Sequence, residues 1–328
     1  MLYIINKNDE ALVACNEAIR LDPNTAYFHS CRCIVLNALS QHKEALAASN
    51  EAIRLDPLIS NYYIQRGNVL LGLKRYKEAL AAYDEAIRFN CNDASAYSGK
   101  GNALNALKRY DEALAACNEA IRFYPYSALL YGLKSNTLHD LERYSEALAI
   151  CNEGLHLYPD NTVLYGCKSN ALYSLKRYEE ALASSNEAIR LDPTLAFVHS
   201  TKGNTLYEMK HYEEALTAYN EAIRLDSTLA FVHTNKGNTF HEMKRFGEAL
   251  AAYNEAIRLD PTLATAYANK GNALHTLNRY EEALAAYNEA ARLEPNIASN
   301  FALTYNSAIL ALQELNNETN VTVRQGSR

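Results

Sequence analysis

Cysteine and histidine side chains are the first candidates for chemistry in this 328-residue chain, but their spacing supports none. The seven cysteines include one close pair, in Cys31-Arg32-Cys33, and zinc sites do not use that spacing. The nine histidines are scattered, and no nucleophile motif or glycine-rich phosphate loop accompanies them. We therefore predict that the protein is not an enzyme and has no catalytic residue, metal or cofactor.

A row of asparagines has the clearest capacity for binding. One asparagine recurs every 34 residues, as Asn68, Asn102, Asn136, Asn170, Asn204, Asn238 and Asn272. Each side-chain amide carries a donor and an acceptor, so such a row could pair with the backbone of an extended peptide of any sequence. The alternative interpretation is that these amides only solvate the surface on which they lie.

Acidic, aromatic and apolar residues accompany the row at fixed offsets. Carboxylates follow three asparagines by four residues, and aromatic or histidine side chains follow five of them by three. These residues are Asp140, Glu208 and Glu242, and His139, Tyr173, Tyr207, His241 and His275. Phe197 and Phe231 precede two asparagines by seven residues, and we expect them to anchor apolar side chains of a ligand. Leu129 and Val163 occupy the same place, and the alternative is that this place packs against a neighbouring element.

A period of 34 residues organises all of these positions. The tripeptide Glu-Ala-Leu occurs nine times without insertion or deletion, beginning at Glu10, Glu44, Glu78, Glu112, Glu146, Glu180, Glu214, Glu248 and Glu282. A stack of identical elements must keep such a register, because each element buries its apolar face on its neighbours.

Residues 264–297 show what one repeat contains. In their second half, Tyr280, Ala283, Leu284 and Tyr287 recur at helical spacing, and Pro295 prevents the helix from continuing. The first half carries a second helical face, on which a small residue, Gly271, allows close approach of the two helices. We name these helices A and B and number positions from the first residue of each full repeat.

This pattern of small residue, tyrosine, alanine, aromatic residue, alanine and proline resembles the tetratricopeptide repeat family over nearly the whole chain. The resemblance implies an all-α fold, a right-handed superhelical α-solenoid of 34-residue antiparallel helix pairs with a C-terminal capping helix. It also implies that helix A lines a concave groove. Positions 2, 5, 6, 9, 12 and 13 are then expected to face that groove.

The repeats divide the chain as follows. We predict a repeat array over 1–316, with a partial repeat at 1–25, full repeats at 26–59, 60–93, 94–127, 128–161, 162–195, 196–229, 230–263 and 264–297, and a capping helix at 298–316. The chain enters the partial repeat within its helix A, so this repeat is expected to consist mainly of helix B, over about Glu10–Leu21. Residues 317–328 are polar and aperiodic, and we expect a disordered tail.

Position 7 carries a cation in every full repeat, where the family usually has an apolar residue. These cations are Arg32, Arg66, Lys100, Lys134, Lys168, Lys202, Lys236 and Lys270. We expect their stems to cover the core and their charges to point away from the groove. Glutamates that recur on helix B, from Glu17 to Glu289, are the expected counter-charges.

Charge and composition limit the partners. The net charge of −6 disfavours nucleic acid, and no apolar run is long enough to cross a membrane. No basic signal sequence begins the chain, so we expect a cytoplasmic protein. Chaperone-binding members of the family hold a C-terminal carboxylate with cations at positions 2, 5 and 6. Those positions lack cations here, so we do not expect that ligand.

We therefore predict a protein–protein interaction scaffold that holds an extended, neutral to basic peptide along the groove, across the repeats of Asn136, Asn170, Asn204 and Asn238. The alternative is a structural module that self-associates through residues 1–25, where Leu2, Ile4 and Ile5 would be exposed. A third possibility is the targeting part of a longer enzyme. The partner's identity is not evident from the sequence.

Overall fold

Helices make up the regular structure of the chain. The computed structural model describes residues 2–313, with only the backbone for residues 2–6. Its α-helices are α1 (Leu2–Leu21), α2 (Ala26–Ala38), α3 (His42–Leu55), α4 (Ser60–Gly72), α5 (Tyr76–Phe89), α6 (Ala94–Ala106), α7 (Tyr110–Phe123), α8 (Ala128–Asp140), α9 (Tyr144–Leu157), α10 (Thr162–Ser174), α11 (Tyr178–Leu191), α12 (Ala196–Glu208), α13 (Tyr212–Leu225), α14 (Ala230–Glu242), α15 (Phe246–Leu259), α16 (Ala264–Thr276) and α17 (Tyr280–Leu293). The 3₁₀ helix η1 (Pro295–Asn300) and a helix over residues 302–313 follow. Residues 2–313 contain no strand, so the all-α prediction is confirmed.

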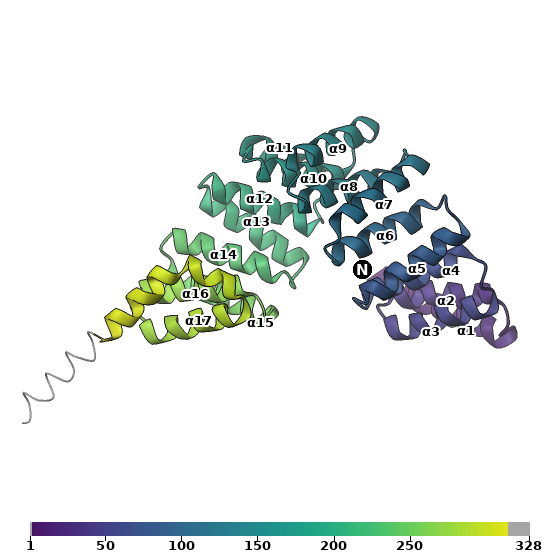
Figure 1. Ribbon diagram of the computed structural model, residues 1–328, viewed down its shortest axis with the longest axis horizontal. Coiled ribbons are helices and arrows are strands. Elements are labelled where there is room, and N and C mark those ends of the chain that lie inside the picture. The colour runs from purple at the N-terminus through teal and green to yellow at the C-terminus, as the bar shows by residue number, and fades with distance from the viewer. Residues whose placement is uncertain (1, 314–328) are drawn as a thin grey trace, which may run out of the picture. The chain divides into compact units, whose positions relative to one another are not determined.

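Each full repeat is a pair of antiparallel helices joined by a short turn, and Figure 1 shows these pairs following one another along the chain. In residues 196–229, helix A is α12 with 13 residues and helix B is α13 with 14 residues. Small alanines such as Ala215 and Ala222 are completely buried on α13 and let the helices approach closely. The same arrangement recurs in each repeat, which confirms the predicted helix pairs.

Every turn from helix A to helix B contains a residue in the left-handed conformation. These residues are Ser40, Lys74, Lys108, Glu142, Lys176, Lys210, Lys244 and Asn278, with φ between 58° and 63°. In the turn after α4, the amide of Lys74 donates to the Leu71 carbonyl and that of Arg75 to the Leu70 carbonyl, both at 2.9 Å. This is the Schellman pattern that ends many helices, although glycine usually occupies the left-handed position. The chain therefore tolerates some backbone strain at each of these turns.

A buried tyrosine of helix B packs directly on the small residue of helix A in four repeats. A Cβ atom added to Gly203 would lie only 2.5 Å from Cε1 of Tyr219, and one added to Gly237 would lie as close to Tyr253. Non-bonded carbon atoms normally lie about 3.5–4.0 Å apart. Glycine is therefore required at these positions, as the sequence predicts.

The repeats form two classes according to the residue in this tyrosine position. The pairs Gly67–Tyr83, Gly203–Tyr219, Gly237–Tyr253 and Gly271–Tyr287 combine glycine with tyrosine, whereas the repeats of Cys33, Gly101, Ser135 and Ser169 carry Ser49, Cys117, Cys151 and Ser185. Tyrosine occurs only where the partner is glycine. Where helix B holds cysteine or serine in place of the tyrosine, helix A can carry a residue larger than glycine. Ser135 illustrates this, because its hydroxyl lies 3.0 Å from the Cys151 sulfur.

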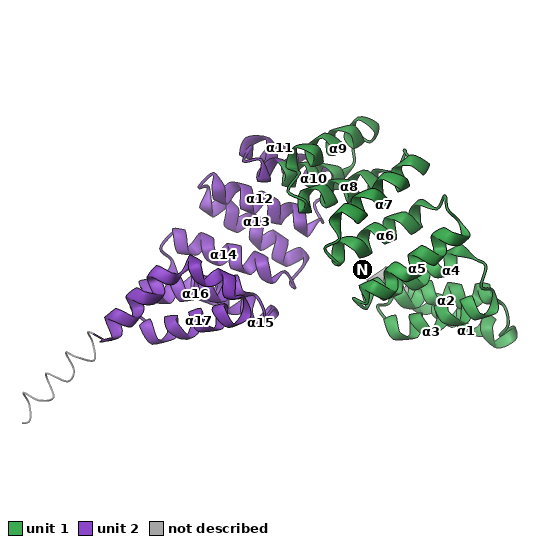
Figure 2. Cartoon of the chain, viewed as in Figure 1, with its two compact units in different colours: residues 1–171 green, residues 172–328 purple. Residues whose placement is uncertain are grey.

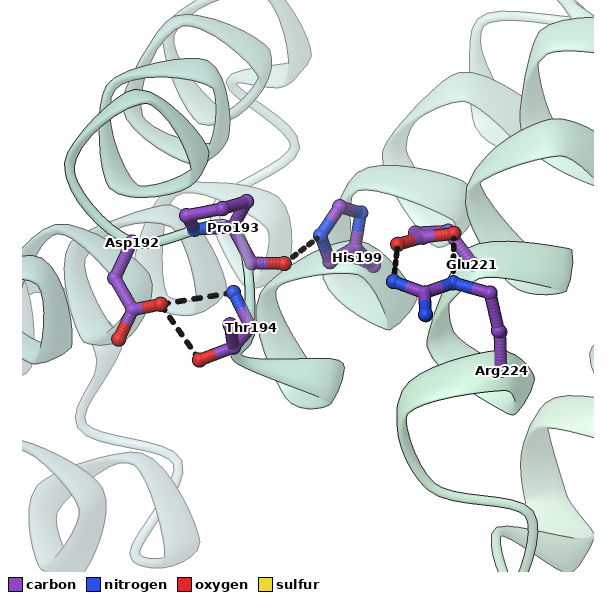
Figure 3. A network of polar contacts seen from close by, with 6 residues as sticks. All are labelled: Asp192, Pro193, Thr194, His199, Glu221 and Arg224. Atoms are coloured by element: carbon purple, nitrogen blue, oxygen red, sulfur yellow. Dashed lines mark hydrogen bonds and ion pairs between the residues drawn. The ribbon is translucent and has the colours of Figure 1, made fainter. Parts of the chain in front are cut away.

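The recurring glutamates of helix B do not neutralise the position-7 cations, contrary to the sequence-based expectation. Within residues 2–313, eight of the nine pair with an arginine one turn later on their own helix, and only Glu153, which is followed by His156, does not. Figure 3 shows one such pair, Glu221 with Arg224, whose atoms lie 2.6 Å apart. Residues three apart on a helix are neighbours, so each of these glutamates lies closer to the arginine of its own helix than to the position-7 cation of helix A. Lys100 shows a different partner for the position-7 cation, since its Nζ lies 2.8 Å from Asp84.

In three repeats the side chain at position 4 of helix A bonds a carbonyl of the preceding loop. The Nε2 of His199 donates to the Pro193 carbonyl at 3.0 Å, and Figure 3 shows this bond beside Asp192, which accepts from the amide and hydroxyl of Thr194. Tyr63 and His29 make the equivalent bonds to the Pro57 and Pro23 carbonyls, both at 2.9 Å. The histidine or tyrosine therefore has a structural role in these three repeats.

Both ends of the array differ from the prediction. Helix α1 is continuous from Leu2 to Leu21, so no turn separates the expected helix B, Glu10–Leu21, from the residues before it. At the other end, residues 298–300 belong to η1 and not to the expected α-helix. This segment buries Ile297 and stacks Phe301 on Tyr287 at 4.7 Å. The side chains of Leu2, Ile4 and Ile5 and the tail 317–328 lie outside the described residues, so self-association remains a prediction.

The chain divides into two compact units, coloured separately in Figure 2. Unit 1 comprises residues 1–171 and unit 2 residues 172–328. The boundary lies within α10, so α11 and all following helices belong to unit 2. Each unit is considered by itself below.

Candidate groove site on the A helices

The asparagines of the row bind the buried tyrosines of helix B in every glycine–tyrosine repeat. In unit 2, the hydroxyls of Tyr219 and Tyr253 donate to the Oδ1 atoms of Asn204 and Asn238, both at 2.9 Å. Tyr287 donates to Asn272 at 2.8 Å, and in unit 1 Tyr83 donates to Asn68 at 2.6 Å. Each bond provides a hydrogen-bond acceptor for a buried phenol, so these asparagines have a structural role that was not expected from the sequence.

A second donor reaches the same oxygen from the next A helix. The Nδ2 of Asn235 donates to Asn204 Oδ1 at 2.9 Å, and that of Asn269 donates to Asn238 Oδ1 at 2.8 Å. An amide oxygen has two lone pairs, so both are used. Only the Nδ2 donor of Asn204 and Asn238 then remains for a ligand. The expectation that each amide offers both a donor and an acceptor is therefore wrong in these repeats.

The remaining asparagines lie in repeats that lack the tyrosine. Cys117, Cys151 and Ser185 occupy the tyrosine position in the repeats of Asn102, Asn136 and Asn170, so no phenol lies there. The Oδ1 of Asn136 accepts instead from the Cys167 thiol at 3.4 Å. The row is therefore continuous in the sequence but has two kinds of environment.

One cavity in unit 2 brings several predicted site residues together. It has a volume of about 280 Å³ and is lined by Tyr207, Asn238, His241, Glu242, Tyr253, Asn269 and Asn272. These residues come from α12, α14, α15 and α16. Five of the seven were expected from the sequence. Asn269 occupies position 6, which was expected to face the groove, although it was not named as a site residue. Tyr253 was missed, because which helix B positions reach the groove depends on the packing of the helices.

Position 12 packs its ring against the first aromatic residue of helix B. The ring centroids are 6.0 Å apart for Tyr173 and Tyr178 and 5.8 Å apart for Tyr207 and Tyr212. Equivalent contacts hold the histidines of this position: His139 with Tyr144, His241 with Phe246, and His275 with Tyr280. Burial, with the charge of Glu242, raises the pKa of Tyr207 to about 12, so its phenol is neutral at physiological pH.

Carboxylates at position 13 lie next to these rings. Burial and then the charge of Glu208 raise the pKa of both Tyr173 and Tyr178. Within residues 2–313, neither Glu208 nor Glu242 has an ion-pair partner. In unit 1, burial raises the pKa of Asp140 and lowers that of His139. The groove side of unit 2 thus carries two carboxylates without a counter-charge.

The apolar residues of position 2 are substantially exposed. The exposed fraction is 41% for Phe197 and 46% for Phe231, and 68% for Leu129 in unit 1. Val163 is exposed to 41%, so none of the four is buried by neighbouring helices. The sequence allows the position-2 residues either to anchor a ligand or to pack against a neighbouring helix. The exposed fractions of the four side chains favour an accessible apolar stripe.

One expected groove position is buried throughout unit 2. Position 5 holds Ser200, Thr234 and Ala268, and all three are buried. The expectation that position 5 lines an open groove is therefore wrong in this unit. Position 6 is mixed, because Thr201 is buried whereas Asn235 and Asn269 are half-buried. The last helix also covers part of the row, because Ser307 lies 3.2 Å from His275 Nε2 and Thr304 lies 3.4 Å from Asn272 Oδ1.

The outer side of unit 2 has a larger hollow, of about 610 Å³, between α11, α12 and α13. Its lining includes Lys202, Leu206, Glu214 and the Glu221–Arg224 pair. Arginine lines the smaller equivalent hollows near Glu78 and Glu146, whereas His211 replaces it here and does not line the hollow. The larger hollow also reaches Ile189 and His199, whose equivalents do not line the smaller ones.

Residues 2–313 contain neither a cluster of metal ligands nor a membrane-spanning helix. Among the residues that the structure describes, no three histidine, cysteine, aspartate or glutamate side chains are grouped as metal ligands would be. No helix in residues 2–313 is long and apolar enough to span a membrane.

Comparisons with known proteins identify the repeats. Models described as tetratricopeptide repeat match residues 35–94, 64–128 and 264–297, and one described as TPR repeat matches 170–210, 203–244 and 237–278. A search of curated proteins finds no match. A chain in the crystal structure of the APC/C hetero-tetramer Cut9-Hcn1 is similar, with a TM-score of 0.66 and 17% identity. The similarity covers 81% of this chain and 52% of that chain, so this chain spans about half of its length.

Proposed function

Because the chain belongs to the tetratricopeptide repeat family, we propose that it is a non-catalytic scaffold that binds an extended segment of a partner protein along its A helices. The family and the fold that it shares with a subunit of a hetero-tetramer support a protein partner. The peptide mode of binding is our inference from the groove side of unit 2. We also place the protein in the cytoplasm, on the sequence argument alone.

The observation that carries the proposal is the fixed orientation of the asparagine amides. Asn204 and Asn238 each hold their Oδ1 in two hydrogen bonds, which leaves Nδ2 as the available group. An Nδ2–H donor pairs with a peptide carbonyl whatever the side chain of that residue is. The pre-formed orientation also lowers the entropy lost when a ligand binds.

The spacing of the donors suits an extended chain. Packed helices lie about 8–10 Å apart, and an extended chain rises about 3.3 Å per residue. Successive asparagines of unit 2 would then reach one carbonyl in about every three residues. Phe197 and Phe231 would contact apolar side chains on the same segment, since both rings are exposed. The uncompensated Glu208 and Glu242 favour a neutral to basic segment and disfavour a terminal carboxylate.

A peptide array with matched asparagine variants tests this proposal. The array carries decapeptides of random sequence and is probed with the wild-type protein, with Asn238→Ala/Asn272→Ala and with Asn220→Ala/Asn254→Ala. The control asparagines are exposed on B helices and line no part of the groove cavity. Circular dichroism establishes that each variant is folded at the temperature of the assay.

We expect the groove variant to bind all peptides more weakly by a common factor of roughly 5- to 30-fold, since two hydrogen bonds of about 1 kcal/mol each are lost. The control variant should bind as the wild type does. Unchanged binding by the groove variant would refute backbone recognition by the asparagine row.

A further inference from the structure

The cavity beside Glu242 has more free hydrogen-bond acceptors than a peptide backbone needs. The Glu242 side chain is exposed and has no ion-pair partner in residues 2–313. Asn269 uses its Nδ2 to bind Asn238, which leaves its Oδ1 without a described donor. The Nε2 atom of His241 is shielded from solvent and also has no hydrogen-bond partner. All three residues line the same cavity.

An aromatic ring forms one wall of this cavity. Tyr207 lies among the lining residues, and its ring is held in place by Tyr212 at a centroid distance of 5.8 Å. Glu242 lines the same cavity as Tyr207, so the carboxylate and the ring border one space. A cation over a tyrosine face is attracted by the ring quadrupole. Ring and carboxylate together therefore favour a positively charged group.

The arginine of this region that could fill the cavity is already engaged. Arg245 bonds Glu248 and contacts Glu213 at 3.3 Å, and it is not among the residues that line the cavity. The carboxylate of Glu242 is consequently available to a cation from another molecule.

Resting on the proposed peptide-binding function, we propose that this cavity binds an arginine side chain of the partner segment. A guanidinium has five donors and no acceptor, so it matches a cavity with a free carboxylate and a free amide oxygen. The acceptors belong to two helices, α14 and α16, and a planar fork can reach both of them at once. The Nδ2 donors of Asn238 and Asn272 pair with backbone carbonyls beside the arginine.

The test uses nonapeptides of alanine and serine that differ only at the central residue, which is arginine, citrulline, lysine or glutamate. Citrulline has nearly the shape of arginine but no charge. Binding is measured by fluorescence anisotropy with the wild-type chain, with Glu242→Gln and with Glu281→Gln. The last variant removes the same charge from an exposed residue of unit 2 that does not line the cavity.

We expect the wild type to bind the arginine peptide at least about tenfold more tightly than the citrulline peptide, as a charge-assisted hydrogen bond implies. Glu242→Gln should reduce this ratio to about twofold and still bind the citrulline peptide, whereas Glu281→Gln should leave the ratio unchanged. Higher salt should reduce the preference in the wild type.

Three outcomes would overturn the inference. If lysine binds as tightly as arginine, the cavity does not select a guanidinium. If all four peptides bind equally, the arginine site is wrong while the proposed peptide-binding function stands. If no peptide binds the wild type at millimolar concentration, the proposed function and the arginine site both fail.

Discussion

Replacing Gly203 with alanine should destabilise the protein, although alanine is normally the better helix residue. The new Cβ atom would lie 2.5 Å from Cε1, 2.6 Å from Cδ1 and 3.0 Å from Cζ of Tyr219. Normal contact is about 3.5–4.0 Å, so the ring would have to move by about 1 Å. Tyr219 is 1% exposed and its hydroxyl is bonded to Asn204, so the ring has little room to move.

The expected magnitude follows from three opposing effects. Overpacking costs about 1–3 kcal/mol, and distortion of the tyrosine–asparagine bond costs about 1 kcal/mol. The higher helix propensity of alanine contributes about 1 kcal/mol in the other direction. We therefore expect a net loss of about 1–3 kcal/mol, measured as a lower midpoint of urea unfolding followed by circular dichroism at 222 nm.

Gly101→Ala is the matched control. Its new Cβ would lie 3.2 Å from Leu133 Cδ2 and 3.4 Å from the Cys117 sulfur, because cysteine replaces tyrosine in that repeat. This variant should be neutral or stabilised by up to about 1 kcal/mol. Adding Tyr219→Cys to Gly203→Ala should remove the penalty of the alanine, giving a coupling energy of about 1–3 kcal/mol. Equal effects of the two alanine substitutions, or no coupling with Tyr219, would refute the packing argument.

Three further predictions concern the same repeats. Asn204→Ala should lower the free energy of unfolding by about 1–2 kcal/mol, because it leaves a buried phenol unpaired. Asn102→Ala, in a repeat without the tyrosine, should lower it by less than about 0.5 kcal/mol. Equal losses in urea unfolding would contradict the structural role of Asn204. Lys108→Gly should raise the unfolding midpoint by the equivalent of about 0.5–1 kcal/mol, since glycine relieves the left-handed strain but is more flexible when unfolded, and a lower midpoint would contradict this. The raised pKa of Tyr207, about 12, favours the neutral phenol in the fold, so its contribution to stability is complete below pH 10 and is lost as the pH rises through 12. Absorbance at 295 nm should show exposed tyrosines ionising near pH 10 and a later step at unfolding, and a single step near pH 10 would contradict the burial of these phenols.

The period of 34 residues was enough to predict the fold because each helix of a repeat must keep the same register. The prolines marked the ends of the B helices and the glycines marked the places where helix A contacts helix B, and α16 begins at Ala264 as the repeat boundary requires. The ends were predicted less well. No neighbouring repeat constrains residues 2–9, and η1 depends on how Ile297 and Phe301 pack on α17, which periodicity does not specify.

The candidate site was predicted only in part, because its polar contacts join different helices. The bond between Asn238 and Tyr253 spans 15 residues and two helices, and a list of groove positions does not show it. One signal in the sequence could have indicated this contact. Tyrosine at the Tyr253 position occurs only with glycine at the Gly237 position, which shows that helix A and helix B touch there. The pairing of Glu221 with Arg224 was also visible, since the two residues are three apart on one helix.

Nuclear magnetic resonance of the asparagine side chains can show whether their Nδ2 donors bind the ligand. The chain is labelled with ¹⁵N at asparagine, and the Nδ2–H signals are assigned with the alanine variants. On titration with the arginine nonapeptide, the signals of Asn238 and Asn272 should shift, while those of Asn220 and Asn254 on the B helices should not. Binding of the peptide without a shift at Asn238 or Asn272, or with shifts at the outer asparagines instead, would contradict the account.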